Sequence, residues 1–381
     1  MKRVLRLPPR DWIGSALVLA GFVLRLRPYL ANRSLWLDEA MLANNILSRS
    51  FAGLTQQLSN DQGAPIGFLF LQKTVTLLLG DSEYALRLLP FLAGCLSLVL
   101  MFLLVRKVAS PFAGGLALAL FAASTALIYY SSEVKQYSSD VAIALALVLL
   151  FLKYECTEIK PWDAFLLSFA GVVAVWFSHP ALFILGGLGL ALFIFALRSK
   201  DTRRLIILLV VALAWGLSLA ALYFINLRQL ASHQFFLDFW REGFLPHDSS
   251  AIRWLAWCLQ APFVDLLGLR LLYPILALLF LIGSFVLTRR LPRFGLFILL
   301  ILLLALFASF LELYPFAGRM ILFLTPLLTL LLAQAVDGIA SSFLQPRWLS
   351  PALFLLMSGF LLFAPARTAR ENFAEQEPRH E

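Results

Sequence analysis

Two adjacent carboxylates, Asp38 and Glu39, stand in the sequence LWLDEA directly after the first long apolar stretch. A carboxylate that is held within about 3 Å of a hydroxyl or an amine can accept its proton and so activate it as a nucleophile. Helix capping is the alternative, because acidic residues in a first turn complement the helix dipole. The dipeptide by itself leaves both interpretations open.

Basic residues recur at the predicted ends of apolar stretches on the same side as this pair. Arginine would bind a phosphate through paired hydrogen bonds, and lysine would bind it as a point charge. Snorkelling to lipid head groups is the alternative for each of them. Two of these basic residues have acidic neighbours, Glu83 near Arg87 and Glu133 near Lys135. Ionisable residues are costly near the membrane, so such pairs favour a functional binding site over snorkelling. The candidates are Arg25, Arg27, Arg87, Lys135 and Arg319.

A metal site has weaker support. His179, in the tripeptide SHP, lies at a predicted helix boundary, and Asp61 precedes the turn GAP at residues 63–65. Either could join an external carboxylate around a divalent ion, but a single histidine provides no ligand spacing. The sequence has no Walker loop and no GxGxxG, HExxH or GxSxG motif. A divalent metal is therefore left open, with Asp61 and His179 as its candidates, and no other cofactor is indicated.

The composition indicates that the segments that must position these residues lie in the lipid bilayer. Of 381 residues, 61% are hydrophobic and only 14% charged, with a mean hydropathy of +0.86. The apolar stretches are long enough to cross a hydrocarbon core of about 30 Å as helices, and they lack the alternation of an outer-membrane barrel. The net charge of +9 falls in short clusters between them, which the positive-inside rule explains without a nucleic-acid partner. We expect an all-α integral membrane protein with a single membrane domain over residues 1–381.

The apolar stretches predict about eleven transmembrane helices, within a range of 10–13. A first helix over 12–30, in which a basic start indicates a retained signal anchor, is followed by an outer loop over 32–87. Central helices over 88–225, a second outer loop over 226–265, C-terminal helices over 266–363 and a polar tail over 364–381 complete the chain. The eleven stretches are 12–30, 88–105, 112–130, 138–152, 162–177, 181–197, 205–225, 266–287, 294–311, 320–336 and 348–363.

One further run, 64–80, decides the topology. It is interrupted by Gln72 and Lys73, and if it lies in the interface, the basic loops at 106–107, 198–204 and 289–293 all share the cytoplasmic side with the N-terminus. If it crosses, all three lie outside. We therefore expect an interfacial helix here and an outer face that carries most of the acidic residues, Asp140 among them.

The second outer loop is rich in aromatic residues. Trp240, Phe244, Trp254 and Trp257 lie within 226–265. They predict one or two amphipathic helices in the interface that cover a lipid-facing cavity. An aromatic belt at the membrane surface is the equal alternative.

In the order of its motifs, the sequence resembles the polyprenyl-phosphate-dependent glycosyltransferases of the GT-C fold, the group of protein O-mannosyltransferases and lipid A aminoarabinose transferases (glycosyltransferase family 39-like). The motifs are RL at 25–26, WLDEA at 36–40, GAPI at 63–66, EYALRLLP at 83–90, SEVKQYS at 132–138 and GR at 318–319. The specific part covers roughly the first 140 residues. No single motif is diagnostic, whereas their order and spacing are.

The resemblance implies inverting transfer of a sugar from undecaprenyl phosphate to a glycan, lipid or protein acceptor on the outer face of the bacterial cytoplasmic membrane. It implies that Asp38 activates the acceptor with support from Glu39, and that Arg87 and Lys135 bind the lipid phosphate. Arg25, Arg319 and Tyr137 are further donor-site candidates. Glu133, Asp61 and His179 are candidates for acceptor contact or support.

Two departures from the family concern the acceptor. Many relatives carry histidine or lysine just before the proline that opens the surface helix, where this chain has Gly63 and Ala64, and many end in an external soluble domain. A lipid-linked sugar transporter or flippase is the rival from another class, although the sequence shows no clear internal repeat. A polysaccharide polymerase or ligase is the third alternative.

Overall fold

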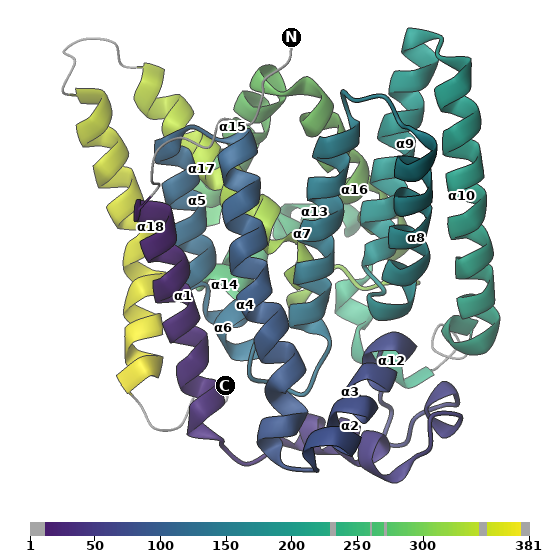
Figure 1. The fold of residues 1–381 in the computed structure, drawn as a ribbon. Coiled ribbons are helices and arrows are strands. Elements are labelled where there is room, and N and C mark those ends of the chain that lie inside the picture. Colours follow the sequence, from purple (N-terminus) through teal and green to yellow (C-terminus); the bar gives the residue numbers. More distant parts are fainter. Residues whose placement is uncertain (1–11, 229–233, 260, 270–272, 343–348, 375–381) are drawn as a thin grey trace.

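The computed structural model describes residues 12–228, 234–259, 261–269, 273–342 and 349–374. Within these ranges the regular structure is entirely helical, which confirms the all-α prediction (Figure 1). The N-terminal half contains α1 (Trp12–Ala31), α2 (Leu37–Ser48), η1 (Gly53–Thr55), α3 (Ile66–Leu79), α4 (Glu83–Val108), α5 (Pro111–Ala123), α6 (Thr125–Tyr130), α7 (Tyr137–Tyr154), α8 (Pro161–Phe177) and α9 (Ala181–Ser199). The rest contains α10 (Thr202–Leu222), η2 (Tyr223–Leu227), α12 (Gln234–Phe239), η3 (Arg241–Gly243), α13 (Ala251–Cys258), α14 (Ala261–Leu267), α15 (Tyr273–Arg290), α16 (Pro292–Phe310), η4 (Gly318–Leu324), α17 (Thr325–Ser342) and α18 (Leu349–Ala374).

Eight helical stretches of the described chain are long and apolar enough to cross a membrane, as expected of a multi-pass membrane protein. The predicted stretches 112–130, 162–177 and 266–287 are not among them, because they fold as α5 with α6, as the 17-residue α8, and as α14 with α15. The count of eleven therefore stays a prediction. The eight are Trp12–Ala31, Glu83–Val108, Tyr137–Tyr154, Ala181–Ser199, Thr202–Leu227, Pro292–Phe310, Gly318–Ser342 and Leu349–Glu371.

The break between α5 and α6 has a local cause in Ser124. Its hydroxyl accepts a hydrogen bond from the backbone N–H of Leu127, which caps the new helix. The same hydroxyl donates to the carbonyl of Leu266 at 2.6 Å, so the break is tied to α14. A stretch that reads as one apolar run is therefore two helices.

Small residues let the helices of the bundle approach closely. A Cβ at Gly21 in α1 would lie 2.7 Å from Leu98 in α4, and one at Gly283 in α15 would overlap the backbone of Leu331 in α17. Between α7 and α16, the rings of Phe151 and Phe297 stack with centroids 4.0 Å apart. This packing fixes α7, which begins at Tyr137 of the site described below, and α17, which directly follows the η4 segment that carries Arg319.

The α2 and α3 helices lie together at one end of the bundle, the site end (Figure 1). The 14 residues of α3 span about 21 Å, too short for a core of about 30 Å, which supports the interfacial placement. Both polar side chains that interrupt it donate hydrogen bonds within the protein, while Oε1 of the buried Gln72 has no hydrogen-bond partner. Gln72 donates to the carbonyls of Ala85 and Leu86, and Lys73 donates to the carbonyl of Leu47.

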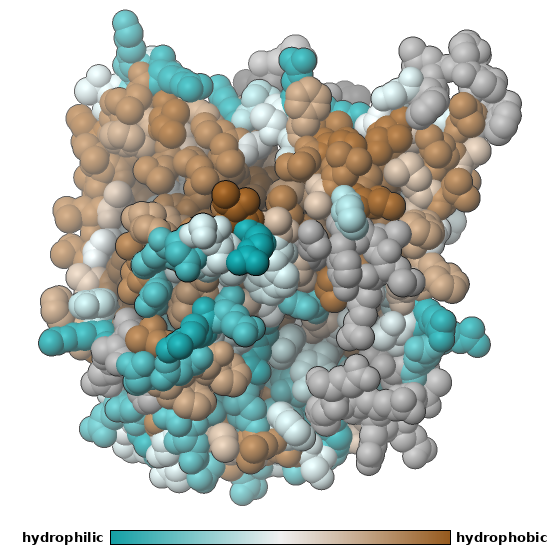
Figure 2. Space-filling model, turned by 180° about the vertical axis from the view of Figure 1, so that it is seen from behind, coloured by the Kyte–Doolittle hydropathy of each residue, from teal (hydrophilic) through white to brown (hydrophobic). Residues whose placement is uncertain are grey.

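The basic loops gather at the opposite end of the molecule. Arg204 donates to the carbonyl of Tyr154 at 2.6 Å, and Arg293 donates to the carbonyl of Glu155 at 2.9 Å. These contacts lie at the far end of α7 from the site. Figure 2 shows apolar residues over the upper part of the molecule and hydrophilic residues around the site end at the bottom, with a shallow hollow between two apolar flanks on this face.

Candidate functional site

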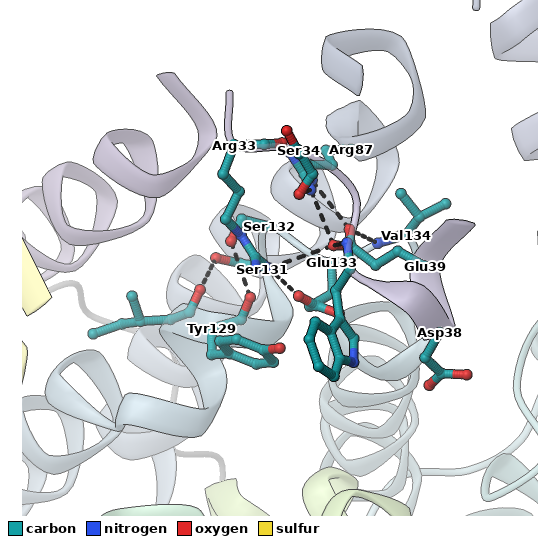
Figure 3. A network of polar contacts seen from close by, with 12 residues as sticks. Arg33, Ser34, Asp38, Glu39, Arg87, Tyr129, Ser131, Ser132, Glu133 and Val134 are labelled. Carbon is teal, nitrogen blue, oxygen red and sulfur yellow. Dashed lines mark hydrogen bonds and ion pairs between the residues drawn. The ribbon is translucent and has the colours of Figure 1, made fainter. Parts of the chain in front are cut away.

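The adjacent acids Asp38 and Glu39 lie in the first turn of α2 and point in different directions (Figure 3). Successive residues of a helix are about 100° apart, so only one of the two can face the core. The side chain of Glu39 is fully buried, whereas that of Asp38 is 29% exposed. The dipeptide therefore combines a buried carboxylate with an accessible one.

Glu39 joins three segments of the chain. Its Oε1 accepts hydrogen bonds from Arg87 Nε at 3.1 Å and from the backbone N–H of Val134 at 3.0 Å. Its Oε2 accepts from Arg87 Nη2 at 3.0 Å and from the backbone N–H of Trp36 at 3.1 Å, the latter as in a capping box. We call Glu39 with Arg87 the clamp. It holds the start of α2 against α4 and the loop before α7, so the capping interpretation holds for Glu39.

A second ion pair borders the clamp. Arg33 binds Glu133 and lies 3.5 Å from Glu39 Oε2, and its guanidinium packs over the ring of Tyr129. Burial and the nearby Glu39 raise the pKa of Glu133 to about 7, against the opposing charge of Arg33. Near neutral pH, Glu133 therefore changes its charge next to the clamp.

Asp38 faces a separate group of cations. Its Oδ1 lies 2.9 Å from Lys135 Nζ, and its Oδ2 lies 3.5 Å from Arg319 Nη1. Gln62 donates to Asp38 at 3.1 Å and accepts from Lys135 at 2.7 Å, so it fixes both groups. The first outer loop, the loop before α7 and the start of η4 thus meet at one point.

The electrostatics of this group leave an excess of positive charge. Burial alone would raise the pKa of Asp38, but Lys135, Arg319 and the hydrogen bond from Gln62 lower it below its usual value. Burial and the neighbouring Arg319 lower the pKa of Lys135, against the effect of Asp38. With Asp38 ionised and both cations charged, the group carries one net positive charge. It is suited to receive one more anion.

Arg319 has donor capacity to spare. Its guanidinium packs over Tyr137 at 5.8 Å and over Trp240 at 5.5 Å, and its buried Nε has no hydrogen-bond partner. Trp240 belongs to the second outer loop, so this loop contacts the cation group through one aromatic ring. An arginine held between two rings with a free N–H is preorganised for an anion.

Several predicted residues lie elsewhere. Arg87 is 1% exposed and directs its donors to Glu39 and to the carbonyls of Arg33 and Ser34, so the structure does not place it as a phosphate ligand. Arg25 is fully buried between helices, where it donates to the carbonyls of Gly21 and Ala122. Arg87 and Arg25 differ from the prediction for the same physical reason. Packing of the bundle buries their long side chains, whereas the sequence alone is equally compatible with side chains that extend to the membrane surface.

The metal candidates do not come together. Asp61 is exposed in a left-handed turn with φ of 50°, whereas His179 lies half-buried between α8 and α9 with its Nε2 unpartnered. Burial lowers the pKa of His179 to about 4, which keeps it neutral at physiological pH. Among the residues that the structure describes, no three His, Cys, Asp or Glu side chains form a group that could hold a metal ion.

Sequence reasoning missed Arg33 and Gln62. Both lie in the first outer loop, next to segments that were singled out, since Arg33 follows α1 and Gln62 follows Asp61. Neither residue type in isolation signals chemistry. Their contribution depends on the loop conformation, which residues 53–65 adopt by packing Leu54 and Leu58 against α2 and α3 in a small separate core.

No protein-family model and no curated protein matches this sequence. Solved structures do match. The Archaeoglobus fulgidus oligosaccharyltransferase, solved with zinc and sulfate, aligns with a TM-score of 0.59 and 16% identity over 97% of this chain and 54% of its own. ArnT from Cupriavidus metallidurans, bound to undecaprenyl phosphate, aligns with a TM-score of 0.52 and 15% identity over 95% of this chain and 74% of its own.

Both neighbours are glycosyltransferases of the GT-C fold, which confirms the fold that the sequence motifs imply. This chain spans about half the length of the oligosaccharyltransferase. At this level of identity the likeness establishes the fold alone, a helical bundle of GT-C type.

Proposed function

We propose that the protein transfers a sugar from a polyprenyl-phosphate donor to an acceptor at the site end of the bundle, with inversion at the anomeric carbon. The observation that carries this proposal is the group of Asp38, Lys135 and Arg319, in which one accessible carboxylate faces two cations at the boundary of an apolar bundle. A lipid-linked phosphate requires such a position, because its chain lies in the membrane and its charge lies at the surface.

Charge balance supports a phosphodiester donor. The ionised Asp38 and one phosphodiester carry two negative charges together, which Lys135 and Arg319 match. The unpartnered Nε of Arg319 offers a donor to the phosphate without displacing Asp38. When the sugar leaves, the lipid phosphate becomes a monoester and gains charge, so the two cations stabilise the leaving group more strongly in the transition state than in the bound donor.

Asp38 is the base in this proposal. The bond between the anomeric carbon and the phosphate oxygen breaks, the bond to the acceptor oxygen or nitrogen forms, and Asp38 accepts the acceptor's proton. Its lowered pKa keeps it ionised at neutral pH and so ready to bind that proton. Glu39 supports it by holding the first turn of α2 through the clamp.

The orientation follows from the basic loops. They lie at the end opposite the site, so the positive-inside rule supports a site on the outer face of the cytoplasmic membrane, with a glycan, lipid or protein as the acceptor. ArnT was solved with undecaprenyl phosphate, which supports a lipid of this class as the donor.

The direct test incubates purified protein with undecaprenyl-phosphate sugars and measures the release of undecaprenyl phosphate. We expect release by the wild type and a loss of about 100-fold in Asp38→Asn, the usual order for general-base catalysis. Asp81→Asn, an exposed acid in the same outer loop, is the matched control and should keep wild-type turnover.

Two outcomes would contradict the proposal. Full turnover by Asp38→Asn would remove the assigned base. In proteoliposomes, movement of the intact sugar lipid across the bilayer without release of lipid phosphate would instead identify a flippase.

A further inference from the structure

A second polar cluster lies deeper in the bundle than the cations. Asp140 follows Tyr137 by three residues on α7, so the two share one face of the helix, one turn apart. The side chain of Ser178, from the segment between α8 and α9, lies beside Asp140. Asp140 is 5% exposed and Ser178 is fully buried, so this cluster is enclosed by helices.

The polar atoms of this cluster are unsatisfied. Asp140 Oδ1 has no hydrogen-bond partner, and neither has Oε1 of the buried Gln136, one turn before Asp140. The hydroxyl of Tyr314, which interacts electrostatically with Asp140, donates to the carbonyl of Met320 at 2.8 Å. An unsatisfied buried polar group is costly, and ionisable residues inside a membrane bundle commonly mark a substrate or ion path.

The cluster and the cation group share a residue. The ring of Tyr137 lies under the guanidinium of Arg319, and its hydroxyl interacts electrostatically with Asp38 and Asp140. A ligand whose phosphate contacts Arg319 can therefore extend past Tyr137 towards Asp140. The unpartnered atoms of Asp140 and Gln136 are hydrogen-bond acceptors, so the part of a ligand that reaches them must bring donors, such as hydroxyl or amino groups.

We propose that Asp140 and Ser178 form the recess that recognises the sugar of the donor, by accepting hydrogen bonds from its hydroxyl or amino groups. This assignment rests on the proposed function, because it takes the phosphate position at Lys135 and Arg319 as its fixed point. It makes Asp140 a specificity-determining residue that contacts the transferred group but not the leaving group.

The test compares two lipids. Binding of undecaprenyl phosphate and of undecaprenyl-phosphate hexose is measured on purified wild type, Asp140→Asn and Ser178→Ala. We expect the wild type to bind the hexose lipid at least tenfold more tightly than the lipid without sugar. Both variants should bind undecaprenyl phosphate within twofold of the wild type, while their preference for the sugar falls to threefold or less. Ser97→Ala is the matched control, because Ser97 is buried in α4 but is satisfied by the carbonyl of Gly94.

The outcomes separate this inference from the proposed function. If the wild type binds neither lipid, the proposed function fails. If it binds both lipids equally, or if Asp140→Asn and Ser178→Ala keep the full preference, the phosphate site stands and the sugar recess is overturned. Should Asp140→Asn fail to fold, Ser178→Ala decides by the same ratio. Deoxy-hexose lipids give a positive check, because removing the hydroxyl that Asp140 binds should make wild type and Asp140→Asn bind alike.

Discussion

The ammonium group of Lys135 lies 2.9 Å from the carboxylate of Asp38, although five helical segments of the outer loop and the bundle separate them along the chain. The two can meet only if the first outer loop and the loop before α7 emerge at the same end. Their contact thus supports the placement of α3 in the interface, on which the whole site depends. It also divides the charged residues of this end into a buried clamp and an accessible cation group.

Arg319 should determine the affinity for the lipid phosphate. We expect Arg319→Ala to weaken binding of undecaprenyl phosphate by about 10- to 100-fold, because it removes one of two phosphate cations and a charge-assisted hydrogen bond. Arg319→Lys should restore only part of the affinity, since lysine keeps the charge but lacks the planar donor group. Arg241→Ala, at an arginine whose side chain is 79% exposed, should have no effect. Equal losses in Arg319→Ala and Arg241→Ala would indicate general surface electrostatics.

The clamp should stabilise the fold without taking part in the reaction. Replacing one partner leaves a buried charge unpaired, so Glu39→Gln and Arg87→Met should each lower the free energy of unfolding by about 3–5 kcal/mol. The double variant should recover much of this loss, because no unpaired charge remains. Denaturant titration of the four proteins in detergent measures the coupling. Strictly additive effects would show that the pair is not coupled.

The stability that Glu133 contributes should fall as the pH rises from about 4.5 to about 7. The folded-state pKa of Glu133 is raised to about 7, so in this window Glu133 keeps its proton in the folded protein and loses it in the unfolded chain. His179 acts in the opposite direction, because its lowered folded-state pKa adds stability as the pH rises from about 4 to about 6.5. The contribution of Glu133 should change by about 1–3 kcal/mol. Thermal unfolding in detergent between pH 4.5 and 8 checks this. The stability of wild type relative to Glu133→Gln should fall as the pH rises through this window, while the difference between wild type and Glu242→Gln, at an exposed acid, should stay constant.

The orientation can be tested with the protein's own thiols. Cys156 is exposed at the end with the basic loops, and Gln56 is exposed in the first outer loop. In a background without Cys95 and Cys258, an impermeant maleimide applied to intact spheroplasts should label Gln56→Cys and not Cys156. Inverted vesicles should give the reverse. Labelling of both positions from the same side would refute the assigned topology.

Much of the fold could be predicted from the sequence, since apolar length and the distribution of arginine and lysine are strong signals in membrane proteins. They place Asp38, Lys135 and Arg319 on one side. They do not tell which of two adjacent acids faces the core, because that depends on whether Leu42 and Ile46 pack inward with Glu39 or with Asp38.

The same limit applies to Arg87 and Asp140. Each stands near the start of an apolar helix, where an outward or an inward side chain is equally compatible with the sequence. The structure turns Arg87 to Glu39 and turns Asp140 into the bundle beside Ser178. Only the packing of segments that are distant in sequence decides between a solvated charge and a buried one.

The clamp also has a consequence for how the chain is made. Glu39 and Arg87 lie at the two ends of the first outer loop, so they can pair soon after α4 has entered the membrane. Lys135 reaches Asp38 only when α7 begins, and Arg319 only after α16 has been inserted. During synthesis, a half-built protein would therefore hold Asp38 in place long before it could retain a phosphate. If the proposed function holds, the capacity to bind the donor is acquired in the last part of translation, when the bundle is almost complete.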